Sequence, residues 1–140
     1  YFLELSRFTK HIMQHFPKFE LKQLNISEID PGVIKAWHVH KQQDDIWFVP
    51  PSHRLLVALR DIRETSNTKD VTMRFVLGGG KGQLMFIPRG VAHGAANLWS
   101  TPSLMFYLVN QQFSSDSKTN DEFRLAWDEF GADIWQQTKG

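Results

Sequence analysis

Cysteine is absent from this 140-residue sequence, so disulfide bonds and thiolate metal ligands are excluded, and cysteine usage leaves the cellular compartment open. No apolar run approaches the roughly twenty residues that span a membrane, and no signal peptide is visible, so no membrane partner is expected. No charge of one sign dominates either. The 16 basic and 15 acidic side chains leave a formal charge of +1 without a basic block, which argues against nucleic acid as a partner.

Aromatic side chains, by contrast, are abundant. They make up 13% of the sequence, and such rings fill the cores of β-sandwiches and also line sugar and base pockets. The length suits one domain, so we expect residues 1–140 to form a single domain. Short segments of alternating apolar and polar residues, separated by glycine and proline turns, predict an all-β sandwich or jelly roll. Strands are predicted at residues 19–29, 33–39, 45–49, 54–62, 71–77, 84–87 and 104–110.

Two terminal segments are predicted to add to this barrel. Residues 6–16 are expected to form a short N-terminal helix with Ser6 as its cap, because apolar residues follow at four-residue spacing. The tail, residues 127–135, is rich in aromatic and acidic side chains and is expected to fold back over the barrel.

Three histidines stand at the ends of apolar runs. Alternation along a strand sends His38 and His40 to the same face. Farther along the chain, Pro88 and Gly90 end another run and turn the backbone, so that His93 projects from the rim. Two histidine-bearing strand ends in a small all-β chain predict one shared pocket at the open end of the barrel.

Two motifs resemble the paired motifs of the cupin superfamily, whose fold is a double-stranded β-helix of the jelly-roll type. In the first, Gly32 precedes the pair His38 and His40, and Asp44 follows in place of the usual Glu. The second matches at five positions with fixed gaps, which makes it specific. Its residues are Gly82, Pro88, Gly90, His93 and Asn97. The resemblance implies an all-β cupin-type barrel for this chain.

Within that superfamily the sequence most resembles the dTDP-4-dehydrorhamnose 3,5-epimerase family, over nearly its whole length. Residues 87–94 read IPRGVAHG where the family has IPEGFAHG. Residues 35–38 read KAWH where the family has RGLH, and Tyr107 lies in the strand that holds its catalytic tyrosine. Further likeness lies in the aromatic segment 1–4, in Gln23 and Asn25 of a polar strand, and in the tail at residues 127–135.

The resemblance implies proton exchange beside the keto group of a nucleotide sugar, a dTDP-4-keto-6-deoxyhexose, with inversion at C3 and C5 or at C5 alone. A base removes a proton to give an enolate, and an acid returns a proton on the other ring face. By matched position, His38 is the base, Asp128 is its carboxylate partner and Tyr107 is the acid. The expected substrate-binding residues are Glu4, Gln23, Asn25, Lys35, His40, Asp45 and His93.

The same resemblance implies no cofactor and no bound metal, a homodimer in which the N-terminal strand reaches the partner sheet, and a cytoplasmic role in polysaccharide synthesis. Two positions depart from the family. Asp45 stands where the family has a lysine near the sugar C4 oxygen, and Lys35 stands where it has an arginine. An anion near that oxygen disfavours the enolate, whose stabilisation is normally the largest catalytic contribution.

Two other functions stay open on the sequence alone. One is a metal-dependent cupin enzyme that holds Fe, Mn or Zn through three histidines and one carboxylate. The other is a sugar-binding cupin that has lost catalytic activity. The main reason to consider it is Asp45, which replaces the family's lysine. The ligands of the metal alternative are His38, His40, His93 and either Asp44 or Asp45.

Overall fold

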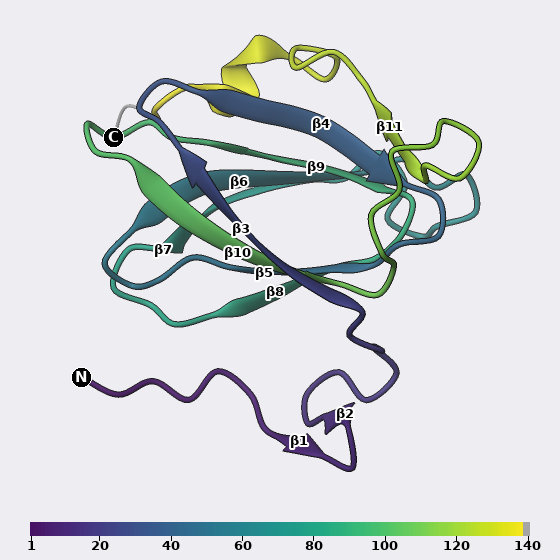
Figure 1. The fold of residues 1–140 in the computed structure, drawn as a ribbon. Helices are drawn as coiled ribbons and strands as arrows, with labels where there is room; N and C mark the ends of the chain where they lie inside the picture. The colour runs from purple at the N-terminus through teal and green to yellow at the C-terminus, as the bar shows by residue number, and fades with distance from the viewer. Residues whose placement is uncertain (139–140) are drawn as a thin grey trace.

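Antiparallel β-strands make up almost all of the computed structural model, which describes residues 1–138 (Figure 1). The larger sheets have four strands in the order β3-β10-β5-β8 and five in the order β11-β4-β9-β6-β7. The predicted all-β class is confirmed. Within the described residues no helix has the length and hydropathy to cross a membrane.

The four-stranded sheet contains β3 (Gln23–Ile29), β5 (Asp45–Phe48), β8 (Leu84–Ile87) and β10 (Ser103–Val109). The five-stranded sheet contains β4 (Ile34–His40), β6 (Arg54–Asp61), β7 (Thr72–Gly78), β9 (Val91–Ala96) and β11 (Glu122–Arg124), and a 3-10 helix, η1 (Ala132–Trp135), follows.

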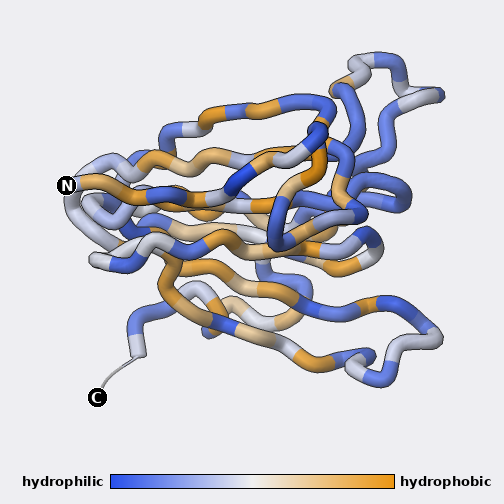
Figure 2. Tube along the Cα trace, turned by 90° about the horizontal axis from the view of Figure 1, so that it is seen from below, coloured by the Kyte–Doolittle hydropathy of each residue, from blue (hydrophilic) through white to orange (hydrophobic). Residues whose placement is uncertain are grey.

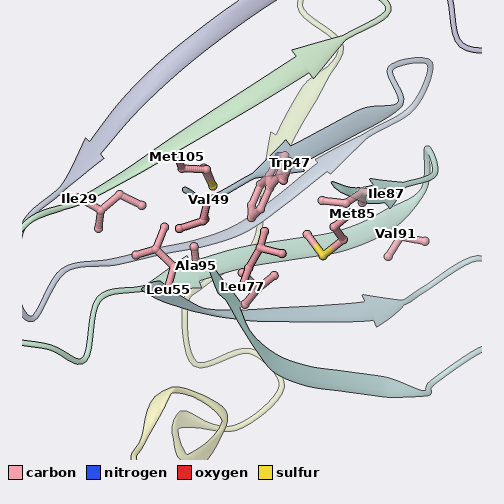
Figure 3. Packing of buried hydrophobic residues seen from close by; sticks show 11 residues of the cluster. Ile29, Trp47, Val49, Leu55, Leu77, Met85, Ile87, Val91, Ala95 and Met105 are labelled. Atoms are coloured by element: carbon pink, nitrogen blue, oxygen red, sulfur yellow. The ribbon is translucent and has the colours of Figure 1, made fainter. Parts of the chain in front are cut away.

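The main hydrophobic core fills the space between these two sheets. Side chains alternate along each strand, so one face of each strand points inward. Trp47 and Met105 of the four-stranded sheet therefore approach Leu77 of the five-stranded sheet (Figure 3). Figure 2 shows hydrophobic residues along the strands and hydrophilic residues in many of the connecting loops. Burial of each large side chain contributes about 1.5–3 kcal/mol, and this burial holds the two sheets face to face.

The C-terminal segment covers the outer face of the five-stranded sheet, as the sequence predicted. Trp135 of η1 is buried against Trp37 of β4. The indole nitrogens of Trp37 and Trp135 both donate to the carbonyl oxygen of Trp127, at 3.1 Å and 2.8 Å. Gly94 of β9 permits this close packing, because an added Cβ would lie 2.9 Å from Cη2 of Trp135. An added Cβ would also lie 2.5 Å from Cβ of Ala36 and 2.8 Å from the carbonyl oxygen of Lys35, so packing against both β4 and the tail explains the glycine in the histidine motif.

The predicted N-terminal helix is wrong. Residues 8–13 form a small hairpin of β1 (Phe8–Thr9) and β2 (Ile12–Met13). Lys10 and His11 form its turn with φ values of 50° and 68°, which an α-helix cannot accommodate. The predicted helix placed Phe8, Ile12 and Phe16 on its apolar face and left Met13 off it. In the structure Met13 is buried and packs next to Phe19. Met13 is the single buried residue of this hairpin, so helical spacing of apolar residues does not describe the segment.

Asp61, at the end of β6, fixes the loop that follows it. Its buried carboxylate accepts hydrogen bonds from Arg63 Nη2 at 2.8 Å, Ser66 Oγ at 2.5 Å and Thr68 Oγ1 at 2.6 Å. Asp61→Asn is expected to lower the free energy of unfolding by about 2–3 kcal/mol, because the three donors lose a charged acceptor that is itself buried. Urea titration measures this. Asp70→Asn, which removes an exposed ion pair with Arg60, is the control and is expected to cost less than about 1 kcal/mol. Equal losses in the two variants would contradict the assignment.

Candidate functional site

A cavity of about 720 Å³ opens between the two sheets, and the histidines of β4 and β9 line it. Inward-facing residues of β3, β4, β9 and β10 form its walls, together with residues between β10 and β11. Two of the predicted site residues, Glu4 and Asp128, are not among the lining residues in the described part of the chain. The predicted residues that do line the cavity are Gln23, Asn25, Lys35, His38, His40, Asp45, His93 and Tyr107.

Glu122 is the carboxylate partner of His38. Strand β11 pairs with β4 so that Arg124 lies opposite His38, and Nδ1 of His38 bonds to Oε1 of Glu122. This hydrogen bond lowers the pKa of Glu122 to about 2, and Arg124 acts in the same direction against the effect of burial. Glu122 is therefore an anion at neutral pH, which favours the His38 tautomer that donates from Nδ1. Nε2 of His38 is then the nitrogen that can accept a proton from a molecule in the cavity.

The predicted pairing of His38 with Asp128 does not occur within residues 1–138. Neighbouring residues of a strand point to opposite faces, so Trp37 packs on the outer face of the sheet while His38 lines the cavity. The tail that contains Asp128 packs on that outer face, where the carbonyl of Trp127 accepts the Trp37 indole. The sheet therefore separates Asp128 from the ring of His38. Sequence position alone could not reveal this separation.

His93 lies at the inner end of the cavity. Its Nδ1–H donates to the carbonyl of Val91 at 2.9 Å, and its Nε2 lies 3.9 Å from Oδ2 of Asp45. Burial lowers the pKa of His93 to about 4, although the charge of Asp45 acts in the opposite direction. The Asp45 carboxylate also accepts from the Gln43 amide at 2.7 Å and the Trp47 indole at 3.1 Å. His93 is thus a neutral imidazole at pH 7, held by a backbone carbonyl.

His40 completes a cluster with these two residues. Its ring stacks on that of His93 with centroids 5.5 Å apart. Its Nδ1 is buried without a hydrogen-bond partner among the described residues, since Asp121 Oδ2 is 3.9 Å away. Its Nε2 lies 3.4 Å from the amide nitrogen of Gln43. One nitrogen from each histidine and an Asp45 oxygen lie within 4.8 Å of one another, a donor set that suits a metal ion.

Tyr107 lines the cavity from the sheet opposite His38. It belongs to β10 and pairs with Asn25 of β3 on one side and Trp47 of β5 on the other. Burial raises the pKa of its phenol, and the negative charges of Asp45 and Glu122 act in the same direction. The phenol is therefore protonated at neutral pH. The His38 imidazole and the Tyr107 phenol thus belong to two different sheets that line the same cavity.

Lys35 and Arg124 bring positive charge to the cavity. Lys35 Nζ donates to Ser27 Oγ at 2.9 Å, and Arg124 Nε donates to Glu122 at 3.2 Å. The side chain of Arg124 is 73% exposed, so most of its donors face solvent. On the opposite wall, the Gln23 amide donates to Asn25 Oδ1 at 2.7 Å. These polar groups line the outer part of the cavity, where a charged or hydroxylated ligand finds hydrogen-bond partners.

Two acidic candidates are committed to structural bonds. The Asp44 carboxylate accepts from the backbone and the guanidinium of Arg89 and from the Asn110 amide. Burial alone would raise the pKa of Asp44, but these hydrogen bonds and the Arg89 charge lower it. Glu4 accepts from Arg7 Nε at 2.7 Å in the N-terminal segment. Asp44 therefore joins loops at the rim. Of the two neighbouring aspartates, Asp45 is the one that lines the cavity.

Sequence reasoning missed Glu122 and Arg124. Both lie on β11, a three-residue strand that follows a polar segment and gives too short an alternation to stand out. The available signal was that both polar residues flank Phe123 in a strand-like pattern. Their positions next to His38 come from the pairing of β11 with β4, which is a tertiary contact.

Comparison with a known family gives a match to almost the whole chain. The family described as dTDP-4-dehydrorhamnose 3,5-epimerase matches residues 1–137. The spore coat polysaccharide biosynthesis protein SpsL of Bacillus subtilis (strain 168) is 40% identical over 129 residues, which cover 92% of this chain and 80% of SpsL.

Solved structures share the fold. A dTDP-4-dehydrorhamnose 3,5-epimerase from Bacillus anthracis str. Ames, with TDP and PPi bound, has a TM-score of 0.72 at 23% identity and covers 86% of this chain and 69% of that one. A dTDP-6-deoxy-D-glucose-3,5-epimerase from Legionella pneumophila Philadelphia 1, in complex with dTDP-4-keto-L-rhamnose, has a TM-score of 0.64 at 25% identity and covers 75% and 54%. The predicted cupin-type jelly roll is confirmed by these structures.

Proposed function

Because this chain belongs to the dTDP-4-dehydrorhamnose 3,5-epimerase family, we propose that it is a nucleotide-sugar epimerase that inverts C3 and C5, or C5 alone, of a dTDP-4-keto-6-deoxyhexose. One observation carries this proposal: a paired imidazole, His38 with Glu122, and a protonated phenol, Tyr107, line opposite walls of one cavity. A structural relative in complex with dTDP-4-keto-L-rhamnose supports the substrate class.

His38 is the proposed base. Its Nε2 takes the proton from the carbon beside the C4 carbonyl, and the electron pair of the broken C–H bond moves onto the carbonyl oxygen to give an enolate. Glu122, bonded to Nδ1, holds the ring in the required tautomer and stabilises the imidazolium that forms. The low pKa of Glu122 keeps the carboxylate ionised while His38 gains its proton. The pair therefore acts as an oriented base at neutral pH.

Tyr107 is the proposed acid. Its hydroxyl gives a proton to the opposite face of the same carbon, the enolate collapses to the ketone, and the centre is inverted. Solvent then reprotonates the phenolate and deprotonates the His38 imidazolium. The raised pKa of Tyr107 suits this role, because the proton stays on the phenol until the carbanion is present. General acids contribute about 10²–10⁴-fold to the rate.

Tyr107→Phe is expected to separate exchange from inversion. The base still removes a proton and returns it on the same face, so deuterium from solvent still enters the substrate. Without the phenol, inversion falls by about 100-fold or more. Nuclear magnetic resonance in D₂O follows both processes in one sample. Equal loss of exchange and inversion, or no loss of either, would remove Tyr107 from the acid role.

The remaining predicted residues form the proposed binding surface. Lys35, together with Arg124, is suited to the diphosphate by its charge, while Gln23 and Asn25 offer hydrogen bonds to the nucleoside or the sugar. His40, Asp45 and His93 form the inner end of the cavity, where we place the sugar ring. We place the reaction in the cytoplasm on the family resemblance, and this location stays a prediction.

Solvent exchange tests the function itself. Purified protein in D₂O is incubated with dTDP-4-keto-6-deoxyglucose, and deuterium at C3 and C5 is measured together with the configuration of each carbon. Deuterium at inverted centres is expected. If the nucleotide sugar binds at saturation and neither carbon exchanges, catalysis on that substrate is excluded and the sugar-binding alternative gains support.

We also propose a homodimer. The polar face of strand β3 points inward and its apolar face points outward. Its polar residues line the cavity, while Leu24 and Ile26 are 60% and 57% exposed. Strand β3 lies at the edge of its sheet, so a second copy can cover this face. The resemblance further suggests that an N-terminal segment, with Glu4, reaches the partner.

Light scattering coupled to size-exclusion chromatography tests the dimer. The native protein is expected at twice the mass of one chain, and the double variant Leu24→Ser, Ile26→Ser is expected to shift towards one chain by losing buried apolar area. The same pair of changes at exposed Val71 and Met73 is the matched control. A native protein with the mass of a single chain would contradict the dimer.

A further inference from the structure

Asp121 lies directly before β11 and links this strand to the loop that follows β4. Its carboxylate accepts hydrogen bonds from the backbone N–H groups of Gln42 and Gln43, each with a nitrogen–oxygen distance of 2.9 Å. The side chain is 18% exposed and lines the cavity. We infer that Asp121 is a positioning residue that holds Glu122 against His38. The consequence for catalysis rests on the proposed function, whereas the contact between Glu122 and His38 can be measured without a substrate.

Strand β11 needs such a link because it is short and lies at the edge of its sheet. It has three residues and pairs with β4 alone among the described strands. After the strand, the backbones of Leu125 and Trp37 exchange two hydrogen bonds, at 3.1 Å and 3.2 Å. Before it, residues 114–120 are almost all exposed, and in the described part of the chain their hydrogen bonds join them to one another or to Glu122. Elements with few buried contacts open locally, so the Asp121 carboxylate is what holds the N-terminal end of β11.

Two groups in the cavity depend on the elements that Asp121 joins. On β11, Oε1 of Glu122 bonds to Nδ1 of His38. On the loop after β4, the side-chain amide of Gln43 donates to Asp45 at 2.7 Å. Bonds from backbone N–H groups to a carboxylate are charge-assisted, so they are roughly twice as strong as bonds to a neutral acceptor. Loss of this acceptor therefore frees both the carboxylate partner of the proposed base and the amide that holds Asp45.

The contacts of Asp121 indicate positioning rather than a direct chemical role. Its Oδ2 accepts from both backbone N–H groups and lies 3.9 Å from Nδ1 of His40, which is beyond hydrogen-bond distance. Within residues 1–138 no hydrogen bond joins Asp121 to His38 or Tyr107. The variant Asp121→Asn keeps one oxygen that can accept from both N–H groups but loses the charge. It should therefore restore part of what Asp121→Ala loses.

Histidine side-chain magnetic resonance of the full chain is the primary test. The Nδ1 proton of His38 is bonded to Glu122, so we expect a downfield resonance that is protected from exchange with water and is absent from His38→Asn. In Asp121→Ala this resonance should broaden or disappear, and Asp121→Asn should lie between this variant and the native chain. Circular dichroism and thermal unfolding verify each fold. A native His38 resonance in folded Asp121→Ala would overturn the positioning role, and if that variant does not fold, a native resonance in Asp121→Asn would do the same.

Solvent exchange into the keto-sugar supplies the second readout. Because a misplacement of about 1 Å costs about 100-fold in rate, Asp121→Ala is expected to lower kcat by about 10–100-fold with little change in KM. Asp116→Ala is the matched control, since that exposed aspartate accepts from the backbone N–H of Lys118 at 2.9 Å in the same connection. It should keep the native His38 resonance and the native rate, and equal losses in both variants would refute a specific role for Asp121. A native chain that shows no exchange would contradict the proposed function instead, and the resonance comparison would still decide the positioning.

Discussion

The His38→Asn protein is expected to lose solvent exchange into the keto-sugar by about 10³-fold or more while keeping its fold. General bases contribute about 10²–10⁴-fold, and no other described residue in the cavity offers an imidazole oriented by a carboxylate hydrogen bond as His38 is by Glu122. Asparagine occupies similar space and cannot accept the proton. Deuterium incorporation at C3 and C5 under saturating substrate measures the loss.

The control for this experiment is His15→Asn, the same change at an exposed histidine outside the cavity. It should exchange at the native rate and unfold at the native temperature. The fold of His38→Asn should also hold, because His38 is partly exposed and lies at the cavity rather than in the packed core. A native exchange rate in folded His38→Asn would take His38 out of the mechanism and would direct attention to His93 or His40 as the base.

The pattern of apolar and polar residues along the sequence was enough to predict most strands of the barrel. Alternation and short apolar runs between turns predicted β3 to β8 and β10 to within a few residues, and alternation sent His38 and His40 to one face. Strand β9 was missed, because small residues around His93 give weak hydrophobic alternation and read as a turn. Gly94 has no room for a side chain, because Lys35 and Ala36 of β4 and Trp135 of the tail pack against it. These residues are far from Gly94 in the sequence, so the sequence pattern around His93 does not reveal the reason for the glycine.

Long-range pairing explains the other failures. The carboxylate beside His38 was assigned by family position to Asp128, whereas the strand that delivers Glu122 is three residues long and is recognisable only by its partner β4. The two faces of β3 are another example. Alternation predicted a half-buried strand but could not say that Asn25 lines a cavity while Ile26 faces outward. A one-residue change of register would exchange these faces.

Glu122→Gln is expected to lower the exchange rate by about 10²–10⁴-fold, whereas Asp128→Asn should stay close to native. In a comparable oriented pair, replacing the carboxylate by an amide costs about 10⁴-fold, because the imidazole takes the wrong tautomer and the imidazolium loses its counter-charge. Asp128 lies across the sheet from His38, so its charge reaches the ring only weakly. Initial rates of deuterium entry at matched protein concentrations compare the two variants.

The two substitutions are matched in chemistry, since each replaces a carboxylate by its isosteric amide near β11. The pKa of Glu122, lowered to about 2 by its bond to His38, means that this carboxylate is ionised throughout any neutral assay, so Gln removes a real charge. If Asp128→Asn instead loses as much activity as Glu122→Gln, both carboxylates serve the base and the tail must reach the cavity during turnover. If only Asp128→Asn is inactive, the partner assigned by family position is the true one, and the pairing of His38 with Glu122 has no catalytic role.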